Sequence, residues 1–170
     1  EDIQKIVLVF FVAIFACAGG NAINDYFDYE IDKINAPGRV LPRGAMSLKT
    51  AYMFSLILFV ISCILAAAVN LVAFSICLAA CILMYIYAMA LKKKPLSGNL
   101  LVSLLTSITF IYGGTAVESY KGVSILALIS FFATVSREII KDIEDLKGDV
   151  KKGAKTLPVI IGVPRSFDIA

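Results

Sequence analysis

The sequence has no histidine, and charged residues make up only 17% of its 170 positions. Without histidine, imidazole-based zinc sites and Ser-His-Asp triads are excluded. Charge is absent altogether between Thr50 and Leu91, and hydrophobic residues reach 59% of the chain. This content, with a mean hydropathy of +0.87, lies outside the range of ordinary soluble domains. The composition therefore indicates a membrane protein.

The lengths of the uncharged runs predict the number of membrane spans. A helix crosses ~30 Å of hydrocarbon with ~20 apolar residues, so the run from Thr50 to Leu91 is twice too long for one helix. We break it at Asn70, because helix interiors disfavour this polar residue. Three further uncharged stretches lie at 6–24, 95–117 and 122–136. We expect an all-α polytopic bundle, a single membrane-embedded domain over 1–170, with transmembrane helices at roughly 3–30, 48–69, 71–91, 97–118 and 122–147.

The basic residues support this count. Five spans in alternating directions place the segments 33–49, 92–94 and 137–165 on one side of the membrane, and these segments hold 14 of the 16 basic residues. Only Lys5 and Lys121 fall on the other side. Basic loops face the cytoplasm in membrane proteins. We therefore expect a multi-pass protein of the cell membrane whose functional face is toward the cytoplasm.

Two further features concern processing and cysteine. A span that begins at Ile3 with no small-residue cleavage site after it argues against a signal peptide. Since the chain has no initiator methionine, we expect a piece of a longer protein that is incomplete at both ends. The four cysteines lie in apolar runs, and two of them, Cys77 and Cys81, share a helix face. With no carboxylate near them in sequence, Cys17, Cys63, Cys77 and Cys81 are expected to be buried small hydrophobic residues rather than metal ligands.

The acidic residues are concentrated in two clusters. Nine of the 13 fall at expected cytoplasmic helix ends: Asp25, Asp28, Glu30 and Asp32 in the first cluster, and Glu138, Asp142, Glu144, Asp145 and Asp149 in the second. The spacing Asp-x-x-Asp-x-x-x-Asp occurs in both, and Leu-Pro follows each of them eight or nine residues later. This repeat suggests two related halves that face each other.

Such clusters predict a bound cation. Positions i, i+3 and i+7 share one helical face, and Asn24, Asp28 and Asp32 form a second polar row beside it. Like charges at these spacings repel each other, and anions at a helix C-terminus oppose the macrodipole. Oxygen ligands shared with a phosphate are the pattern of Mg²⁺, whereas the spacing and the glycine of an EF-hand are missing.

The fifth expected helix gives the same indication. Its uncharged stretch 122–136 spans roughly 22 Å, which is less than the hydrocarbon core of ~30 Å. Arg137, Glu138, Lys141 and Asp142 therefore lie near or below the hydrocarbon boundary and must face a wet cavity or the bundle interior. The alternative is that Arg137 and Lys141 pair with the acids along the helix and snorkel to the surface.

Basic residues complete a site for a diphosphate. Lys92, Lys93 and Lys94 end the third expected helix, and Arg39 and Arg43 lie in the loop 35–44. A Mg²⁺–diphosphate complex needs such cations on the oxygens that the metal does not bind, although each lysine alone is equally explained as a topology anchor. Tyrosine rings stabilise allylic cations, but they are also common at any membrane interface. The candidates are Tyr26, Tyr29, Tyr85, Tyr87 and Tyr112.

Two long motifs carry a family resemblance. The first is Asn21-Ala-Ile-Asn24-Asp25-Tyr-Phe-Asp28-Tyr-Glu-Ile-Asp32, with Arg39, Leu41-Pro42 and Gly44 behind it. The second is Asp142-Ile-Glu-Asp145-Leu-Lys-Gly-Asp149, with Gly153 and Thr156-Leu157-Pro158 behind it. They resemble the two signatures of the UbiA-type intramembrane prenyltransferases, and Tyr87-x-x-x-Leu91-Lys92 with Gly98-Asn99 is similar to a weaker signature between them. The resemblance covers nearly the whole chain.

This resemblance implies a fold and a set of roles. The fold is a nine-helix bundle with a cavity open to lipid, and the activity is Mg²⁺-dependent transfer of a prenyl group from its diphosphate. The implied catalytic and metal-binding residues are Asn24, Asp28, Asp32, Asp145 and Asp149, with Asp25 and Asp142 as further metal ligands. The implied substrate-binding residues are Arg43, Tyr87, Lys92, Lys94, Arg137 and Lys141.

The acceptor is indicated by the run Ser-Arg-Glu-Ile-Ile-Lys-Asp-Ile-Glu-Asp at 136–145. It resembles most closely the archaeal members that prenylate geranylgeranylglyceryl phosphate for ether lipids. The expected partners are thus a prenyl diphosphate, a lipid acceptor and the bilayer, with no nucleic acid. An aromatic quinone precursor such as 4-hydroxybenzoate is the alternative acceptor. A different class, the ion-coupled secondary transporter, would place its acids on broken helices at the midplane, and a CDP-alcohol phosphotransferase would need an Asp-Gly-x-x-Ala-Arg motif that the chain lacks.

Overall fold

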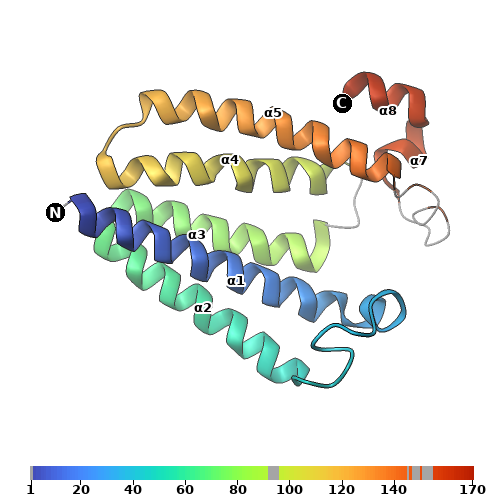
Figure 1. The fold of residues 1–170 in the computed structure, drawn as a ribbon, viewed down its shortest axis with the longest axis horizontal. Coiled ribbons are helices and arrows are strands. Elements are labelled where there is room, and N and C mark those ends of the chain that lie inside the picture. The colour runs from blue at the N-terminus through green and yellow to red at the C-terminus, as the bar shows by residue number, and fades with distance from the viewer. Residues whose placement is uncertain (1, 92–95, 145, 147–149, 151–154) are drawn as a thin grey trace. The chain divides into compact units, whose positions relative to one another are not determined.

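The computed structural model describes residues 2–91, 96–144, 146, 150 and 155–170. Within these ranges the chain is helical and has no strand, and five helices are long and apolar enough to cross a membrane. Both the all-α fold and the number of spans are therefore confirmed. The elements are α1 (Asp2–Asn35), α2 (Leu48–Val69), α3 (Leu71–Ile86), the π-helix η1 (Tyr87–Leu91), α4 (Ser97–Val117), α5 (Lys121–Glu144), α7 (Leu157–Ile161) and α8 (Val163–Ile169) (Figure 1).

Asn70 breaks the long uncharged run, as expected. It ends α2 and caps α3, because its extended backbone leaves the helical path and its side-chain oxygen accepts the Ala73 N–H at 2.8 Å. The side-chain amide also donates to the Thr115 carbonyl at 3.0 Å. The break is thus stabilised on both sides, by a helix cap and by a tertiary hydrogen bond.

Two helices differ from their expected bounds. α1 continues to Asn35 instead of ending near residue 30, so the whole first acidic cluster lies on a helix. The span expected at 71–91 changes from α-helix to π-helix at Tyr87. A short π-helical stretch inside a span is often found at functional sites, and this one contains the Tyr87 motif.

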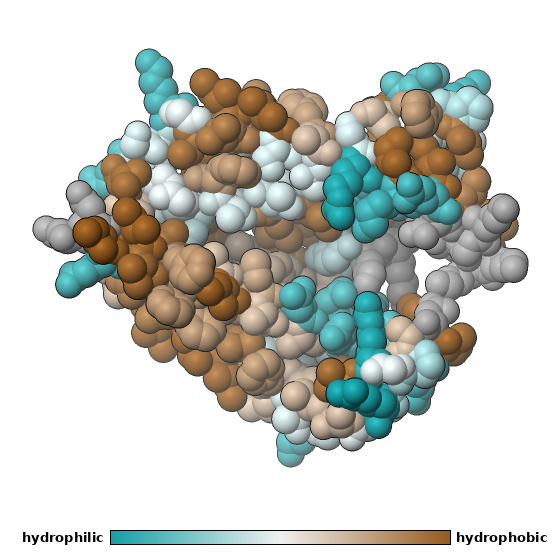
Figure 2. All heavy atoms as spheres, viewed as in Figure 1, coloured by the Kyte–Doolittle hydropathy of each residue, from teal (hydrophilic) through white to brown (hydrophobic). Residues whose placement is uncertain are grey.

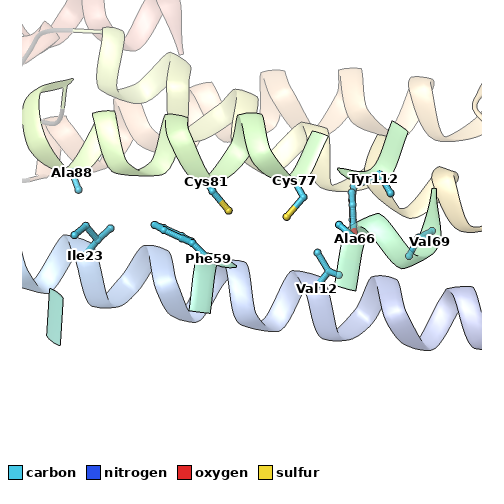
Figure 3. Packing of buried hydrophobic residues seen from close by; sticks show 10 residues of the cluster. Val12, Ile23, Phe59, Ala66, Val69, Cys77, Cys81, Ala88 and Tyr112 are labelled. Atoms are coloured by element: carbon cyan, nitrogen blue, oxygen red, sulfur yellow. The ribbon is translucent and has the colours of Figure 1, made fainter. Parts of the chain in front are cut away.

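The chain forms two compact units, one of residues 1–89 with 112–118 and the other of residues 90–111 with 119–170. In the first unit α1, α2 and α3 pack around a core that also includes Tyr112 of α4. Figure 3 shows the side chains of this core, among them Phe59, Cys77 and Cys81, filling the space between the helices. Their burial fixes the position of α1, which carries the first acidic cluster.

A close crossing of α1 and α2 depends on small residues. The Ser55 hydroxyl of α2 donates to the Gly19 carbonyl of α1 at 2.8 Å. A side chain at Gly19 would meet the ring of Phe59 at 2.8 Å, which is too close for any Cβ atom. Small residues and buried hydroxyls of this kind let membrane helices approach each other closely.

The second unit contains the first part of α4, α5 and the short helices α7 and α8. Ile139 of α5 is fully buried, and the Ser136 hydroxyl of the same helix donates to the backbone carbonyl of Ala170. α5 ends at Glu144, and the rest of the expected span to 147 is outside the described residues, apart from Leu146, which is helical. The C-terminal helices are thereby attached to the end of α5 that carries the second acidic cluster.

The cysteines follow the expectation only in part. Cys77 and Cys81 are buried and Cys63 is partly buried, but Cys17 is exposed. The expectation of burial is wrong for Cys17 because its face of α1 also carries the exposed side chains of Phe10 and Ile14, and no helix of the first unit covers it.

Candidate active site

The first acidic cluster lies along the last turns of α1. The i, i+4 spacing brings Asn24 and Asp28 together, and the Asn24 amide donates to Asp28 Oδ2 at 3.1 Å. Asp28 and Asp32 are buried, with 8% and 7% of their surfaces exposed. Carboxylates are seldom buried in this way unless a cation or several donors compensate them.

A guanidinium from the following loop supplies part of that compensation. Arg39 Nη1 donates to Asp32 Oδ2 at 2.8 Å and contacts Asp25 Oδ1 at 3.4 Å. The hydrogen bond to Asp32, followed by the charge of that carboxylate, raises the pKa of Arg39. One arginine thus bridges two of the three aspartates that share the i, i+3, i+7 face.

The loop 36–47 is folded so that Arg39 reaches back to α1. Successive turns join Ala36 to Arg39 and Arg39 to Arg43 by backbone hydrogen bonds, and Leu41 is buried beneath them. Gly44 has a φ of +75°, a conformation that residues with a Cβ atom rarely adopt, and the Ser47 hydroxyl then caps α2 by accepting the Thr50 N–H at 3.0 Å. The Leu-Pro and Gly of the first motif therefore shape the loop that presents both arginines.

A cavity of about 510 Å³ lies between this loop and α1. Its lining is mainly polar or charged: Asn21, Asn24, Asp25, Gly38, Arg39, Val40 and Arg43. In Figure 2 hydrophilic residues gather where α1 ends and the loop begins, whereas hydrophobic ones prevail along α1 and α2. The volume is in the range of small-molecule sites, and the mixture of one carboxylate, two amides and two guanidinium groups can hold both a cation and an anion.

The second cluster is described only up to Glu144. Asp142 Oδ2 accepts a hydrogen bond of 2.8 Å from the Asn99 amide, near the start of α4. Asp145 and Asp149, and the lysines Lys92 and Lys94, lie outside the described residues. Their expected roles as metal ligands and diphosphate contacts remain predictions.

Arg137 and Lys141 pair with an acidic residue along their own helix, which is the alternative that the sequence offered to a wet cavity. Both pair with Glu138, at 2.9 Å for Arg137 and 3.6 Å for Lys141. Their own side chains are 68% and 49% exposed, whereas that of Glu138 is 15% exposed. The two cations thus form ion pairs along α5. Because both cations are exposed, these pairs contribute little to the free energy of unfolding.

The tyrosines mostly pack against one another. Tyr26 and Tyr52 lie 5.1 Å apart between ring centroids, and the hydroxyls of Tyr52 and Tyr85 are 3.4 Å apart. Tyr112 is buried in the core, and the ammonium of Lys33 lies 4.4 Å from the ring centre of Tyr29. Tyr87 lies in η1 and is half-buried. None of these rings lines the cavity formed by α1 and the loop.

Sequence reasoning missed two asparagines and misjudged one arginine. Asn21 lines the cavity, and the amide of Asn99 donates a hydrogen bond to Asp142. The sequence indicates both residues only as members of motifs and predicts neither role. The sequence places Arg39 among the cations for a diphosphate, whereas in the structure it pairs with Asp25 and Asp32 of the acidic cluster. A polar amide within or beside a long apolar run was the signal available for both asparagines, since such groups are costly in a membrane without a partner.

The donor set of the first cluster fits Mg²⁺. Asn24, Asp25, Asp28 and Asp32 offer only oxygen ligands from their amide and carboxylate groups, as Mg²⁺ prefers. The guanidinium of Arg39 contacts two of these carboxylates, Asp25 and Asp32. The cluster therefore already stabilises a positive charge at this position.

Comparison with known proteins decides the family. The sequence model of the UbiA prenyltransferase family matches residues 1–170. The chain belongs to this family. It is a multi-pass membrane protein, and membership in the UbiA family sets aside the transporter and phosphotransferase alternatives.

Individual UbiA relatives are similar over almost the whole chain. A digeranylgeranylglyceryl phosphate synthase of Thermococcus gammatolerans is 53% identical over 165 residues, which cover 97% of this chain and 60% of the relative. A solved structure of digeranylgeranylglyceryl phosphate synthase has a TM-score of 0.89 at 43% identity and covers 98% of this chain and 59% of its own. A UbiA homologue from Archaeoglobus fulgidus bound to GPP and Mg²⁺ has a TM-score of 0.72 at 25% identity, covering 96% and 59%. The chain therefore spans about 60% of the length of the UbiA proteins that it matches.

Proposed function

We propose that the protein containing this chain transfers a prenyl group, geranylgeranyl, from its diphosphate to geranylgeranylglyceryl phosphate, with Mg²⁺ as cofactor. The observation that carries this proposal is the identity of 45–53% to curated digeranylgeranylglyceryl phosphate synthases over at least 97% of the chain. The cluster of oxygen ligands on α1, in which Asp28 and Asp32 are buried, supports it independently, since it offers a site for a metal and a diphosphate together.

Asn24, Asp25, Asp28 and Asp32 would hold the metal at the end of α1. Mg²⁺, when bound there, polarises the diphosphate and makes it a better leaving group. Asp28 and Asp32 suit this task because they are buried, so water competes little for their oxygens. Asn24 donates to Asp28 Oδ2 and thereby fixes the orientation of that carboxylate.

Arg43 would bind the anionic part of the substrate, whereas Arg39 compensates the acidic cluster. Both line the cavity beside Asp25, and guanidinium groups match the geometry of phosphate oxygens. Arg39 stabilises the carboxylates of Asp25 and Asp32 through its two contacts. Arg43 is our candidate for the phosphate of the acceptor, and its role is distinct because it makes no ion pair within the described part of the chain.

The transfer step forms one bond and breaks one. The acceptor hydroxyl attacks the allylic carbon, a C–O ether bond forms, and the C–O bond to the diphosphate breaks. Its electron pair leaves with the diphosphate, and the hydroxyl proton passes to a base or to solvent. The role of the enzyme is to align the two substrates and to neutralise the leaving charge.

The second acidic cluster would complete the site. We propose that Asp145 and Asp149, with Asp142 held by Asn99, bind a second metal that acts on the same diphosphate. The repeated spacing of the two clusters supports this arrangement. A metal–diphosphate–metal unit requires roughly 6–10 Å between the two sets of carboxylates, from metal–oxygen distances of ~2.1 Å. Lys92, Lys94 and Tyr87 are then substrate contacts, and Arg137 and Lys141 become available if diphosphate displaces them from Glu138.

The orientation in the membrane follows from the charge distribution. We infer that the basic segments 33–49, 92–94 and 137–165 face the cytoplasm of the cell membrane, and that the active site opens on that side. The excess of lysine and arginine in these segments supports this, since positive loops are retained on the cytoplasmic side.

A competition assay with the full-length enzyme in membranes tests the proposal. We expect labelled geranylgeranyl diphosphate to be transferred to geranylgeranylglyceryl phosphate in a Mg²⁺-dependent reaction, and Asp28→Asn to lower turnover by at least about hundredfold, because loss of a ligand exceeds the 10–100-fold cost of losing its supporting contacts. Preferential prenylation of 4-hydroxybenzoate would overturn the acceptor, and undiminished turnover of Asp28→Asn at limiting Mg²⁺ would overturn the metal site.

A further inference from the structure

Three cysteines converge in the core of the first unit, away from the acidic cluster. Cys63 comes from α2 and Cys77 and Cys81 from α3, and their sulfur atoms all lie within 4.8 Å of one another. The sulfurs of Cys63 and Cys77 are 4.0 Å apart. Figure 3 shows the side chains of Cys77 and Cys81 pointing from α3 into the helix interface. Helical spacing in the sequence places Cys77 and Cys81 on one face of α3. Only the packing of α2 against α3 brings Cys63 to them.

A serine hydroxyl supplies a fourth ligand position. Ser62 Oγ lies 3.5 Å from the sulfur of Cys77 and 3.6 Å from that of Cys81. The Ser62 hydroxyl donates its proton to the Phe59 carbonyl at 2.8 Å, so its lone pairs are directed to the thiols. This hydrogen bond is the kind of outer contact that orients a metal ligand.

Three of the distances in the cluster lie close to the edges of a tetrahedral metal site. Bonds of ~2.3 Å to sulfur and ~2.1 Å to oxygen give sulfur–sulfur edges of about 3.8 Å and sulfur–oxygen edges of about 3.6 Å. The observed 4.0 Å between Cys63 and Cys77 and the 3.5 and 3.6 Å to Ser62 lie within a few tenths of an ångström of these values. The remaining sulfur pairs need to shorten by at most about 1 Å, which thiol rotation about χ1 can supply.

An apolar groove and an unpartnered hydroxyl lie beside the cluster. An apolar groove of about 720 Å³ along α2 and α3 is lined by both Cys63 and Cys81. Tyr112, in the same core cluster (Figure 3), buries a hydroxyl that has no hydrogen-bond partner among the residues that the structure describes. A thiolate in the cluster is an acceptor for such a hydroxyl.

We propose that Cys63, Cys77, Cys81 and Ser62 form a binding site for a thiophilic metal ion, of the class of Zn²⁺ or Cu⁺, that clamps α2 to α3. Binding releases protons from the thiols, two for a divalent ion and one for a monovalent ion, so that the complex is neutral in its apolar surroundings. Soft sulfur ligands discriminate against Mg²⁺, and the site is therefore separate from the proposed catalytic metal. The inference stands independently of the prenyl-transfer proposal.

Cadmium is a suitable probe because its bonds to thiolates absorb in the ultraviolet and those to carboxylates do not. Full-length enzyme in detergent, reduced and freed of metal, is titrated with Cd²⁺ in saturating Mg²⁺, which occupies the carboxylates. We expect the thiolate absorption to saturate at one Cd²⁺ per chain. In the same sample Cd²⁺ should protect Cys63, the thiol of the cluster that is only partly buried, from maleimide labelling, read by mass spectrometry, while the exposed Cys17 is labelled as before. Competition by Zn²⁺ and by Cu⁺ then identifies the preferred ion.

Single substitutions sharpen the test. Cys77→Ser should weaken Cd²⁺ binding at least tenfold, whereas Cys17→Ser, a matched change on the exposed face of α1, should leave it unchanged. Absence of thiolate absorption at stoichiometric Cd²⁺, or equal labelling of Cys63 with and without Cd²⁺, would overturn the proposal. The labelling comparison uses the unmodified protein, so it decides the question even if Cys77→Ser does not fold. Mg²⁺-dependent prenyl transfer, measured on the same preparation, reports separately on the proposed function.

Discussion

Replacing Arg39 by alanine should make the free energy of unfolding of the enzyme depend more strongly on Mg²⁺ than it does in the wild type. The Arg39 guanidinium donates to Asp32 at 2.8 Å and contacts Asp25 at 3.4 Å. Arg39→Ala leaves the Asp32 side chain, which is only 10% exposed, without this cation and close to two other carboxylates. In the absence of metal, the truncation should therefore destabilise the protein.

The magnitude follows from the two contacts. A hydrogen bond between charged groups contributes about 1.5–3 kcal/mol when shielded, but half of the Arg39 side chain is exposed, and exposed pairs contribute about 0–1 kcal/mol. We therefore expect a loss of about 1–2 kcal/mol without metal. At about 2–4 °C per kcal/mol for a protein of this size, the unfolding midpoint should fall by roughly 2–8 °C.

Thermal unfolding of the full-length enzyme in EDTA and in Mg²⁺ measures this effect. Bound Mg²⁺ neutralises the same carboxylates, so the difference between wild type and Arg39→Ala should shrink to less than about 0.5 kcal/mol when metal is present. Arg43→Ala is the matched control, because Arg43 lines the same cavity but makes no ion pair with a residue that the structure describes. An equal loss for Arg39→Ala in EDTA and in Mg²⁺, or an equal loss for both variants, would refute the reasoning.

Three further outcomes are expected. Arg43→Ala should raise the KM for geranylgeranylglyceryl phosphate by about tenfold, as expected for one lost phosphate contact, and should raise the KM for the prenyl diphosphate less. Steady-state kinetics with each substrate varied in turn measures both, and a larger rise for the prenyl diphosphate would contradict the assignment. Asn99→Ala removes the amide donor of Asp142 and should lower turnover by about tenfold with normal membrane insertion, whereas Asn99→Asp should be worse because it adds a negative charge; activity equal to wild type in both would exclude a role for this pair. Asn70→Ala removes the cap of α3 and the contact to Thr115 and should cost about 1–2 kcal/mol; denaturation of the purified protein with no shift in midpoint would show that the break needs no cap.

The regular parts of the fold were predictable because they depend on local pattern. Uncharged runs of the length of a bilayer gave five spans, and the polar, helix-disfavouring Asn70 marked the break between α2 and α3. The end of α1 was less predictable. Its last turn, from Ile31 to Asn35, continues past the predicted end, because helix ends depend on contacts such as that of Asp32 with Arg39 rather than on hydrophobic pattern.

One part of the candidate site, the row of acidic residues on α1, was predictable from local spacing, whereas its basic partner was not. Helical spacing alone places Asn24, Asp28 and Asp32 in one row, since side chains four residues apart lie on the same face. Which basic residue compensates them was not deducible, because five or more cations in loops were equally available. The choice of Arg39 rests on the turns of the loop 36–47 and on burial of Leu41, which determine how far that side chain reaches.

By itself, the sequence determined the membrane class, the number of membrane spans, the two acidic clusters and the family, since each is written in composition or in short-range spacing. Only the tertiary structure decided which distant residues meet: Arg39 with Asp25 and Asp32, Asn99 with Asp142, and Cys63 with Cys77 and Cys81. The physical reason is that spacing along a helix fixes the face on which a side chain lies, whereas its partner depends on how helices and loops pack. Burial of apolar surface between helices settles that packing, and no local motif encodes it.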